Sequence, residues 1–292
     1  MRFGSKVEST EQKEMRKPRE SQAPRPSGSF AREISLWALL ARGSIYKILI
    51  VLILMTAAEI VMFSRKLQVF AEWNFVGDTY IDSFSRFDRV FYASDILTLF
   101  LAAFCLVSFV LVWSQLETHG TKSRYTLMRL RVTGSHLFWV TTGYNFLCYL
   151  LLSAIQIGAA LWMCQQYRER MPAELVSSQF EFLAFYQTGL LHELFPLADA
   201  AKWIRSLLMF FALSAMAAGQ SRMSPWRRMW MVAFYPSAGI WLVASEGLGF
   251  QMVDVVWYVV FATLLVVSVL RGIGVWGTDK SVREVSQGTR QK

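Results

Sequence analysis

The chain consists of long apolar blocks separated by shorter polar segments. Within each block the apolar residues follow one another almost without interruption, unlike the spaced pattern of a soluble core. A helix needs about 20 such residues to cross a bilayer. Six blocks approach that length, at residues 45–63, 91–113, 136–163, 201–219, 229–245 and 253–270. They predict an all-α fold, a polytopic membrane protein with six transmembrane helices.

The segment just before the first block, residues 29–43, is amphipathic. Its apolar positions Phe30, Ile34, Trp37 and Ala41 recur at helical spacing, and polar residues occupy the other side. This pattern predicts an interfacial helix that lies in the membrane plane before the first span. The alternative is that the segment extends the first span inward.

Composition supports lipid as the solvent. Hydrophobic residues make up 54% of the chain and charged residues 17%, whereas a soluble domain has about a quarter charged residues. We predict a disordered cytoplasmic tail at 1–28, a six-span membrane domain at 29–275 and a cytoplasmic tail at 276–292. Residues 164–200 contain short apolar stretches, but none is long enough to cross the bilayer.

Basic residues are unevenly distributed between the two sides of the predicted spans. One side holds the N-terminal region, the loops 116–135 and 221–228 and the C-terminal tail, with 22 of the 30 lysines and arginines. The positive-inside rule places that side in the cytoplasm. We therefore predict cytoplasmic termini and a multi-pass protein of the cell membrane. The rule also accounts for the net charge of +9. Because the chain has no separate domain that could bind a nucleic acid, we expect no nucleic-acid partner.

Motifs for catalysis or metal binding are incomplete. Residues 272–281 (GIGVWGTDKS) resemble a phosphate-binding loop, but Lys280 is displaced by two positions. His192 and Glu193 begin like a zinc-protease motif, but Pro196 stands where the second histidine is needed. The three cysteines have no paired spacing, so neither a disulfide nor a zinc site is indicated. We predict no catalytic residue, no metal site and no cofactor bound by this chain, and hence no enzyme.

Few polar side chains fall inside the predicted spans, where lipid makes them costly. Glu59 lies in the outer half of the first span, and Asn145 and Gln156 lie in the third. One interpretation is that they line a helix interface or a substrate path. The other is that Asn145 and Gln156 only form hydrogen bonds across packed helices, in which case Glu59 alone stands out.

The predicted cytoplasmic loop 116–135 mixes apolar and basic residues. Ser123 can cap a short helix there, and Gly134 can end it. An exposed helix of this kind suits the docking of a soluble partner. The alternative is that its arginines only satisfy the positive-inside rule and touch lipid headgroups. The candidate docking residues are Arg124, Tyr125, Leu127, Met128, Arg129, Leu130 and Arg131.

These features together resemble the membrane subunits of ATP-binding-cassette (ABC) transporters of the type-2, exporter-like permease family. The resemblance covers most of residues 29–275, with an amphipathic helix before six spans and both ends inside. A Tyr-Thr-Leu-x-Arg-Leu stretch at residues 125–130 lies between spans two and three. Val132, Thr133 and Gly134 then lead directly into span three, as in the family's coupling-helix region.

The resemblance implies a division of labour between subunits. A separate ABC ATPase subunit would bind ATP with Mg²⁺, and helix 121–131 would sit in a groove of that subunit as the coupling helix. Two permease chains, as a homodimer or heterodimer, would face each other around spans one, two and five. They would enclose the path of an unidentified amphipathic, lipid or peptide substrate. The segment 172–195 would cover the outer mouth.

Two other classes of function stay open. A non-transporting integral membrane protein, acting as an anchor or assembly factor for a membrane complex, accounts for the spans equally well. It needs no ATPase partner. An intramembrane enzyme would need paired catalytic groups at similar depth on neighbouring helices, and the sequence shows no convincing pair.

Overall fold

The part of the chain that the computed structural model describes is a bundle of helices. In these residues every regular element is a helix, and five helices are long and apolar enough to cross a membrane. This confirms the prediction of an all-α, multi-span membrane protein; the two predicted tails lie outside the described residues. The five are α1 (Ser29–Asn74), α3 (Ile96–Glu117), α5 (Gly134–Arg170), α8 (Ala200–Gly219) and α10 (Gln251–Ile273). The described residues are 29–74, 87–117, 133–171, 178–196, 200–220, 234–240 and 251–274.

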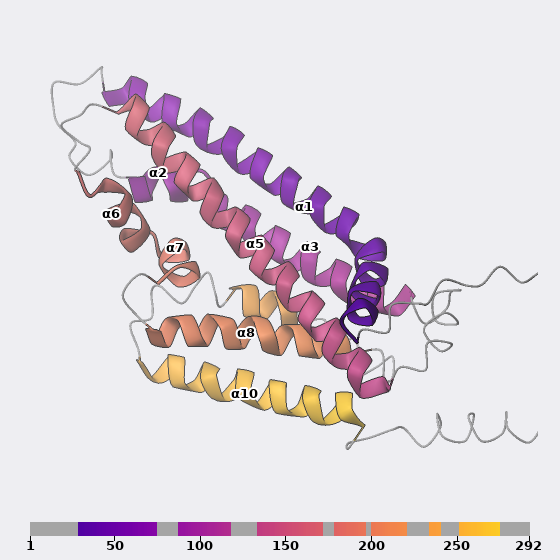
Figure 1. The fold of residues 1–292 in the computed structure, drawn as a ribbon. Coiled ribbons are helices and arrows are strands. Elements are labelled where there is room, and N and C mark those ends of the chain that lie inside the picture. Colours follow the sequence, from indigo (N-terminus) through magenta and orange to yellow (C-terminus); the bar gives the residue numbers. More distant parts are fainter. Residues whose placement is uncertain are drawn as a thin grey trace, which may run out of the picture.

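The segment predicted as a separate interfacial helix, residues 29–43, is the beginning of α1. The helix runs without a break into the first span, although its first turns bend away from the direction of the rest (Figure 1). Leu36 is buried, and Trp37 lies against Gly143 of α5. Packing on α5 therefore fixes the position of this segment, which continues the first span without a break, as the alternative interpretation stated.

Two helices are much longer than the apolar blocks that predicted them. α1 has 46 residues and α5 has 37, which correspond to about 70 Å and about 55 Å at 1.5 Å per residue. The hydrocarbon core of a bilayer is only about 30 Å thick. The extensions contain polar residues, but they bury Leu67 and Tyr167 against other helices. Hydropathy alone misses such extensions because their stability comes from packing rather than from lipid.

The predicted second span is interrupted at its start. A short helix, α2 (Phe87–Ala93), ends before Asp95, whose φ of 52° is left-handed, and α3 begins at Ile96. Aspartate tolerates this conformation better than most residues. The apolar block 91–113 therefore belongs to two helices rather than one.

α8 and α10 run parallel to each other. At one end the Tyr258 hydroxyl of α10 donates to the Ala201 carbonyl of α8, and at the other a Cβ on Gly219 would lie 3.9 Å from the Ser268 carbonyl oxygen. The end of α8 and the start of α10, which flank the sequence 220–250, therefore lie at opposite ends of the bundle.

Only a small part of the predicted fifth span, 229–245, lies in the described residues. Residues 234–240 are helical. The Tyr235 hydroxyl donates to the Leu213 carbonyl at 3.4 Å, and Gly239 lies against Phe104 of α3. This helical segment is thus packed between α8 and α3.

The helix ends gather at two ends of the bundle (Figure 1). We call one the basic end; it holds the starts of α1 and α5 and the ends of α3, α8 and α10. Ser44 of α1 and Tyr144 of α5 share a hydrogen bond of 2.7 Å near it, and Phe138 of α5 packs against Ala218 and Gly272. The end of α3 at Glu117 and the start of α5 at Gly134, which flank the basic sequence 118–132, both lie at this end.

The opposite end holds α2 and two further short helices. These are α6 (Phe180–Gln187) and α7 (Gly189–Leu194), which occupy the space where α5 and α8 diverge (Figure 1). With eight and six residues, neither can cross a bilayer. In the described part of 164–200 the prediction of no additional span is therefore confirmed.

Replacing Gly272 with alanine should destabilise the bundle at the basic end. The new Cβ would lie 2.5 Å from two atoms of the Phe138 ring, which is itself buried. We expect a loss of about 1–3 kcal/mol in unfolding free energy, as for other overpacked sites, seen as a lower melting temperature in detergent. Gly158→Ala is the matched control, because no described atom lies within 4 Å of its Cβ. A Gly272→Ala variant as stable as this control would contradict the packing.

Candidate functional site: polar groups buried in the helix bundle

Glu59 of α1 and Gln156 of α5 face each other inside the bundle. Both side chains are fully buried. Although the carboxyl and the amide are close enough to interact, none of their four polar atoms has a hydrogen bond of ordinary geometry among the described residues. Two of the three polar residues singled out from the sequence thus form one contact between two long helices.

Asn145, the third of these residues, lies elsewhere on α5. Its Nδ2 donates to the Ser214 carbonyl of α8 at 3.3 Å, while its Oδ1 has no hydrogen-bond partner among the described residues. Eleven residues separate it from Gln156, or about 16 Å along the helix. Asn145 therefore bonds across packed helices, and the three residues do not form one continuous site.

The seven candidate docking residues of the loop, from Arg124 to Arg131, lie outside the described residues. The structure describes the helices on either side of them. α3 ends at Glu117 and α5 begins at Gly134, both at the basic end. The docking prediction itself stays a prediction.

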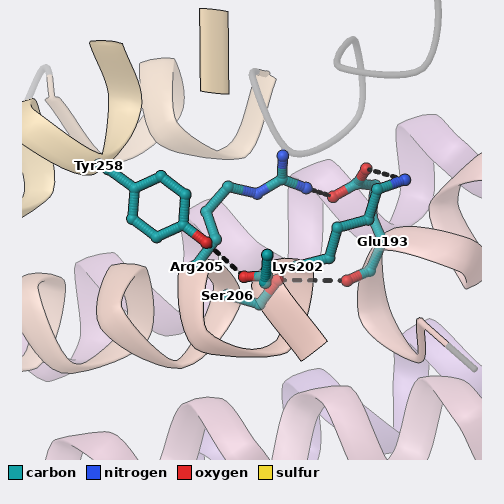
Figure 2. Close-up of polar contacts among 6 residues, drawn as sticks. Glu193, Lys202, Arg205, Ser206 and Tyr258 are labelled. Carbon is teal, nitrogen blue, oxygen red and sulfur yellow. Dashed lines mark hydrogen bonds and ion pairs between the residues drawn. The ribbon is translucent and has the colours of Figure 1, made fainter. Parts of the chain in front are cut away.

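A buried ion pair that the sequence did not reveal joins α7 to α8 (Figure 2). Arg205 Nη2 of α8 donates to Glu193 Oε2 of α7. Lys202 Nζ lies 3.6 Å from the other carboxylate oxygen. The Arg205 side chain is 2% exposed and that of Glu193 is 5% exposed, so both charged groups are withdrawn from solvent.

Two further hydrogen bonds extend this cluster to backbone groups. Ser206 Oγ donates to the Glu193 carbonyl at 3.2 Å, and the Tyr258 hydroxyl of α10 donates to the Ala201 carbonyl (Figure 2). The cluster therefore ties α7, α8 and α10 together at the end opposite the basic end.

Burial makes this ion pair different from those on the surface. Removing two charges from water costs several kcal/mol per ion, and only close pairing offsets that cost. Arg168 and Glu181, by contrast, are 3.6 Å apart with side chains 67% and 61% exposed. A pair of that kind contributes about 1 kcal/mol or less.

The sequence did not predict this pair. Lys202 and Arg205 are among the basic residues predicted on the outer side, and they lie in the first two turns of α8, at the end opposite the basic end. Glu193 drew notice only as part of an incomplete zinc motif. Its partner is 12 residues away, across a helix end, which is not a spacing that helical periodicity can detect. The one signal in the sequence was a pair of cations inside an otherwise apolar block.

Other groups offer little chemistry among the described residues. No cluster of three or more His, Cys, Asp or Glu side chains there could hold a metal ion. Cys148 and Cys164 are buried and Cys105 is half-buried, and none of the three forms a disulfide.

Comparison with protein-family models, with curated proteins and with solved structures finds no match to this chain. The candidate sites therefore depend on the chain's own geometry.

Replacing Arg205 with leucine should strongly destabilise the protein, because Glu193 would stay buried without its closest cation. We expect a loss of about 3–5 kcal/mol, measured by unfolding in detergent with denaturant. Arg168→Leu, which breaks the exposed pair, should cost about 1 kcal/mol or less. Equal effects of the two substitutions would show that the Arg205 pair is not buried.

The Glu59 and Gln156 contact can be tested with a double-mutant cycle. Gln156→Leu should cost about 1–3 kcal/mol, because it leaves the Glu59 carboxyl facing apolar atoms. The double variant Glu59→Leu/Gln156→Leu should recover most of that stability, since both partners become apolar. Asn145→Leu combined with Glu59→Leu is the control and should show additive effects. Additivity at the Glu59 and Gln156 positions as well would contradict their contact.

Proposed function

We propose that this chain is the membrane-spanning permease subunit of an ABC transporter, driven by a separate ATPase subunit and paired with a second permease chain. The observation that carries the proposal is the basic loop 118–132, which connects α3 and α5 at the basic end. A force on that loop would act directly on both helices. α5 in turn contacts α1, α8 and α10, so the motion would spread through the bundle.

The proposal includes six spans with the basic end in the cytoplasm of the cell membrane. Support comes from the parallel arrangement of α8 and α10, because the segment between them must return along the length of the bundle. A crossing at 229–245 meets that requirement. The basic end carries the connections richest in lysine and arginine, as the positive-inside rule requires. The first turns of α1 would lie near the inner interface.

The mechanism would be rigid-body switching between two access states. ATP and Mg²⁺ would bind in the partner subunit, and its closure would push on the 121–131 helix. α1 and α5 are long enough to carry a displacement from the basic end to the opposite end. There the α7 helix is tied to α8 by Glu193 and Arg205. The apolar and aromatic spans suit an amphipathic substrate better than a small ion.

A second candidate is a non-transporting anchor or assembly factor of a membrane complex. One observation favours it: Glu59, Asn145 and Gln156 are fully buried between helices, rather than exposed along a path. A path completed by a second copy would be lined by residues that are exposed on the single chain, and these three are instead buried within it.

Pull-down from native membranes should recover an ATPase that has a phosphate-binding loop. We expect Arg124→Ala/Leu127→Ala/Arg129→Ala to lose that partner, because the substitutions remove the charged and apolar contacts of the proposed coupling helix. Arg283→Ala/Arg290→Ala in the C-terminal tail removes two charges from the same predicted side and should keep the partner.

Two outcomes would overturn the permease proposal. One is retention of the ATPase and of transport by the loop variant. The other is the recovery of only non-ATPase membrane proteins, which would favour the anchor. A single cysteine at position 125 should also react with membrane-impermeant reagents from the cytoplasmic side, and labelling from outside would reverse the orientation.

A further inference from the structure

α6 leaves an apolar strip uncovered. Phe182 is 50% exposed, Leu183 38% and Tyr186 57%, whereas Ala184 and Phe185 on the other side of the helix are buried. The rings of Phe182 and Tyr186 stack on each other with centroids 6.2 Å apart. Helical geometry brings the three exposed side chains onto one face.

Ring contacts connect this helix to the first turn of α8. Tyr186 meets His192 of α7 edge-on at 5.3 Å. Phe185 contacts Phe195 at 6.3 Å, and Phe195 meets Trp203 of α8 edge-on at 5.3 Å. α6 is therefore linked, through the segment that contains α7, to the point where a candidate membrane span begins.

The surface of α8 beyond that point is apolar and exposed. Ile204 is 61% exposed and Leu207 39%, as expected of a helix face that meets lipid. Lys202, one turn before Ser206, remains partly exposed. Aromatic rings gather where a span passes from hydrocarbon to water, with charged groups just outside. The ring cluster between α6 and α8 thus has the composition of that boundary.

The kind of occupant follows from the size and chemistry of the strip. A stable protein interface takes about 20–30 residues from each side, and α6 offers three large apolar side chains on eight residues. A short helix with aromatic residues on one face and charged residues beside it suits the boundary between headgroups and acyl chains. The Arg168 and Glu181 pair supplies exposed charges next to the strip.

We propose that α6 lies in the bilayer interface at the end opposite the basic end, with Phe182, Leu183 and Tyr186 inserted between lipid headgroups and acyl chains. This inference depends on the membrane-spanning fold but not on the permease function. The helix would hold α7, and with it the Glu193 and Arg205 pair, at a set depth in the membrane.

Spin labels can measure this depth directly. Single cysteines at positions 182, 183 and 186, in a Cys105→Ala background, would carry a nitroxide in the full chain reconstituted in phosphatidylcholine and phosphatidylglycerol vesicles. Cys148 and Cys164 are buried, and the protein without an added cysteine gives their background signal. A label at 181, which is also exposed but points to the other side of the helix from Leu183, is the matched control.

We expect labels at 182, 183 and 186 to be several-fold more accessible to oxygen than to a water-soluble nickel reagent, and the label at 181 to show the reverse. Nickel accessibility at 182 and 186 equal to that at 181 would overturn the proposal. Protection of these labels from both reagents would also overturn the proposal. Spin–spin broadening of the spectra would then show that a second copy of the chain covers the apolar strip.

A second variant guards against an effect of the labels themselves. Phe182→Ser/Tyr186→Ser replaces exposed side chains and removes the ring contact between Tyr186 and His192, so it should lower the melting temperature in detergent by only a few degrees. In vesicles it should lower the ratio of oxygen to nickel accessibility at position 183 several-fold, because the helix loses its apolar anchor. An unchanged ratio would show that lipid does not hold α6 through these residues.

Discussion

Close packing around α5 is the constraint on which the described bundle depends. Its side chains contact α1, α3, α8 and α10 along its length and α2, α6 and α7 near its end. Lipid tails are as apolar as leucine, so helices in a membrane are held together by complementary shape and by polar contacts rather than by the hydrophobic effect. Tyr149 of α5 shows both kinds of interaction: its ring stacks on Phe210 of α8, and its hydroxyl shares a hydrogen bond with Ser108 of α3.

Buried polar groups divide this bundle into regions with different energetics. Along the spans, neutral hydroxyls bond within their own helix or to the next one, as Ser214 and Thr142 do with carbonyls one turn earlier. Such contacts cost little because the backbone supplies the partner. The full charges of Glu193 and Arg205 are found instead at one end, where three helices meet. That placement fits the high cost of charge in hydrocarbon and makes the end a rigid unit.

The lengths of α1 and α5 connect these regions to the proposed function. Both helices exceed the bilayer thickness and continue into the packed end that holds α2, α6 and α7. A displacement at the basic end would therefore reach the opposite end without crossing a flexible joint in either helix. The same rigidity would also serve an anchor that holds a fixed shape for other subunits. The two functions differ in whether a motor acts on the loop between α3 and α5, and not in the architecture of the bundle.

The sequence by itself determined the solvent of each segment. Uninterrupted apolar blocks identified α1, α3, α5, α8 and α10, because crossing lipid requires a length of apolar helix that few other structures need. The sequence also identified Glu59 and Gln156 as polar residues within apolar blocks. Only the tertiary structure decided that these two residues face each other while Asn145 faces α8. The structure also showed that α1 and α5 continue beyond their apolar blocks. It showed as well that Glu193 pairs with Arg205. Hydropathy indicates whether a residue meets lipid or water. The partner of a buried residue depends instead on how each helix is rotated and how the helices cross. Rotation and crossing follow from side-chain packing between segments that are far apart in the chain.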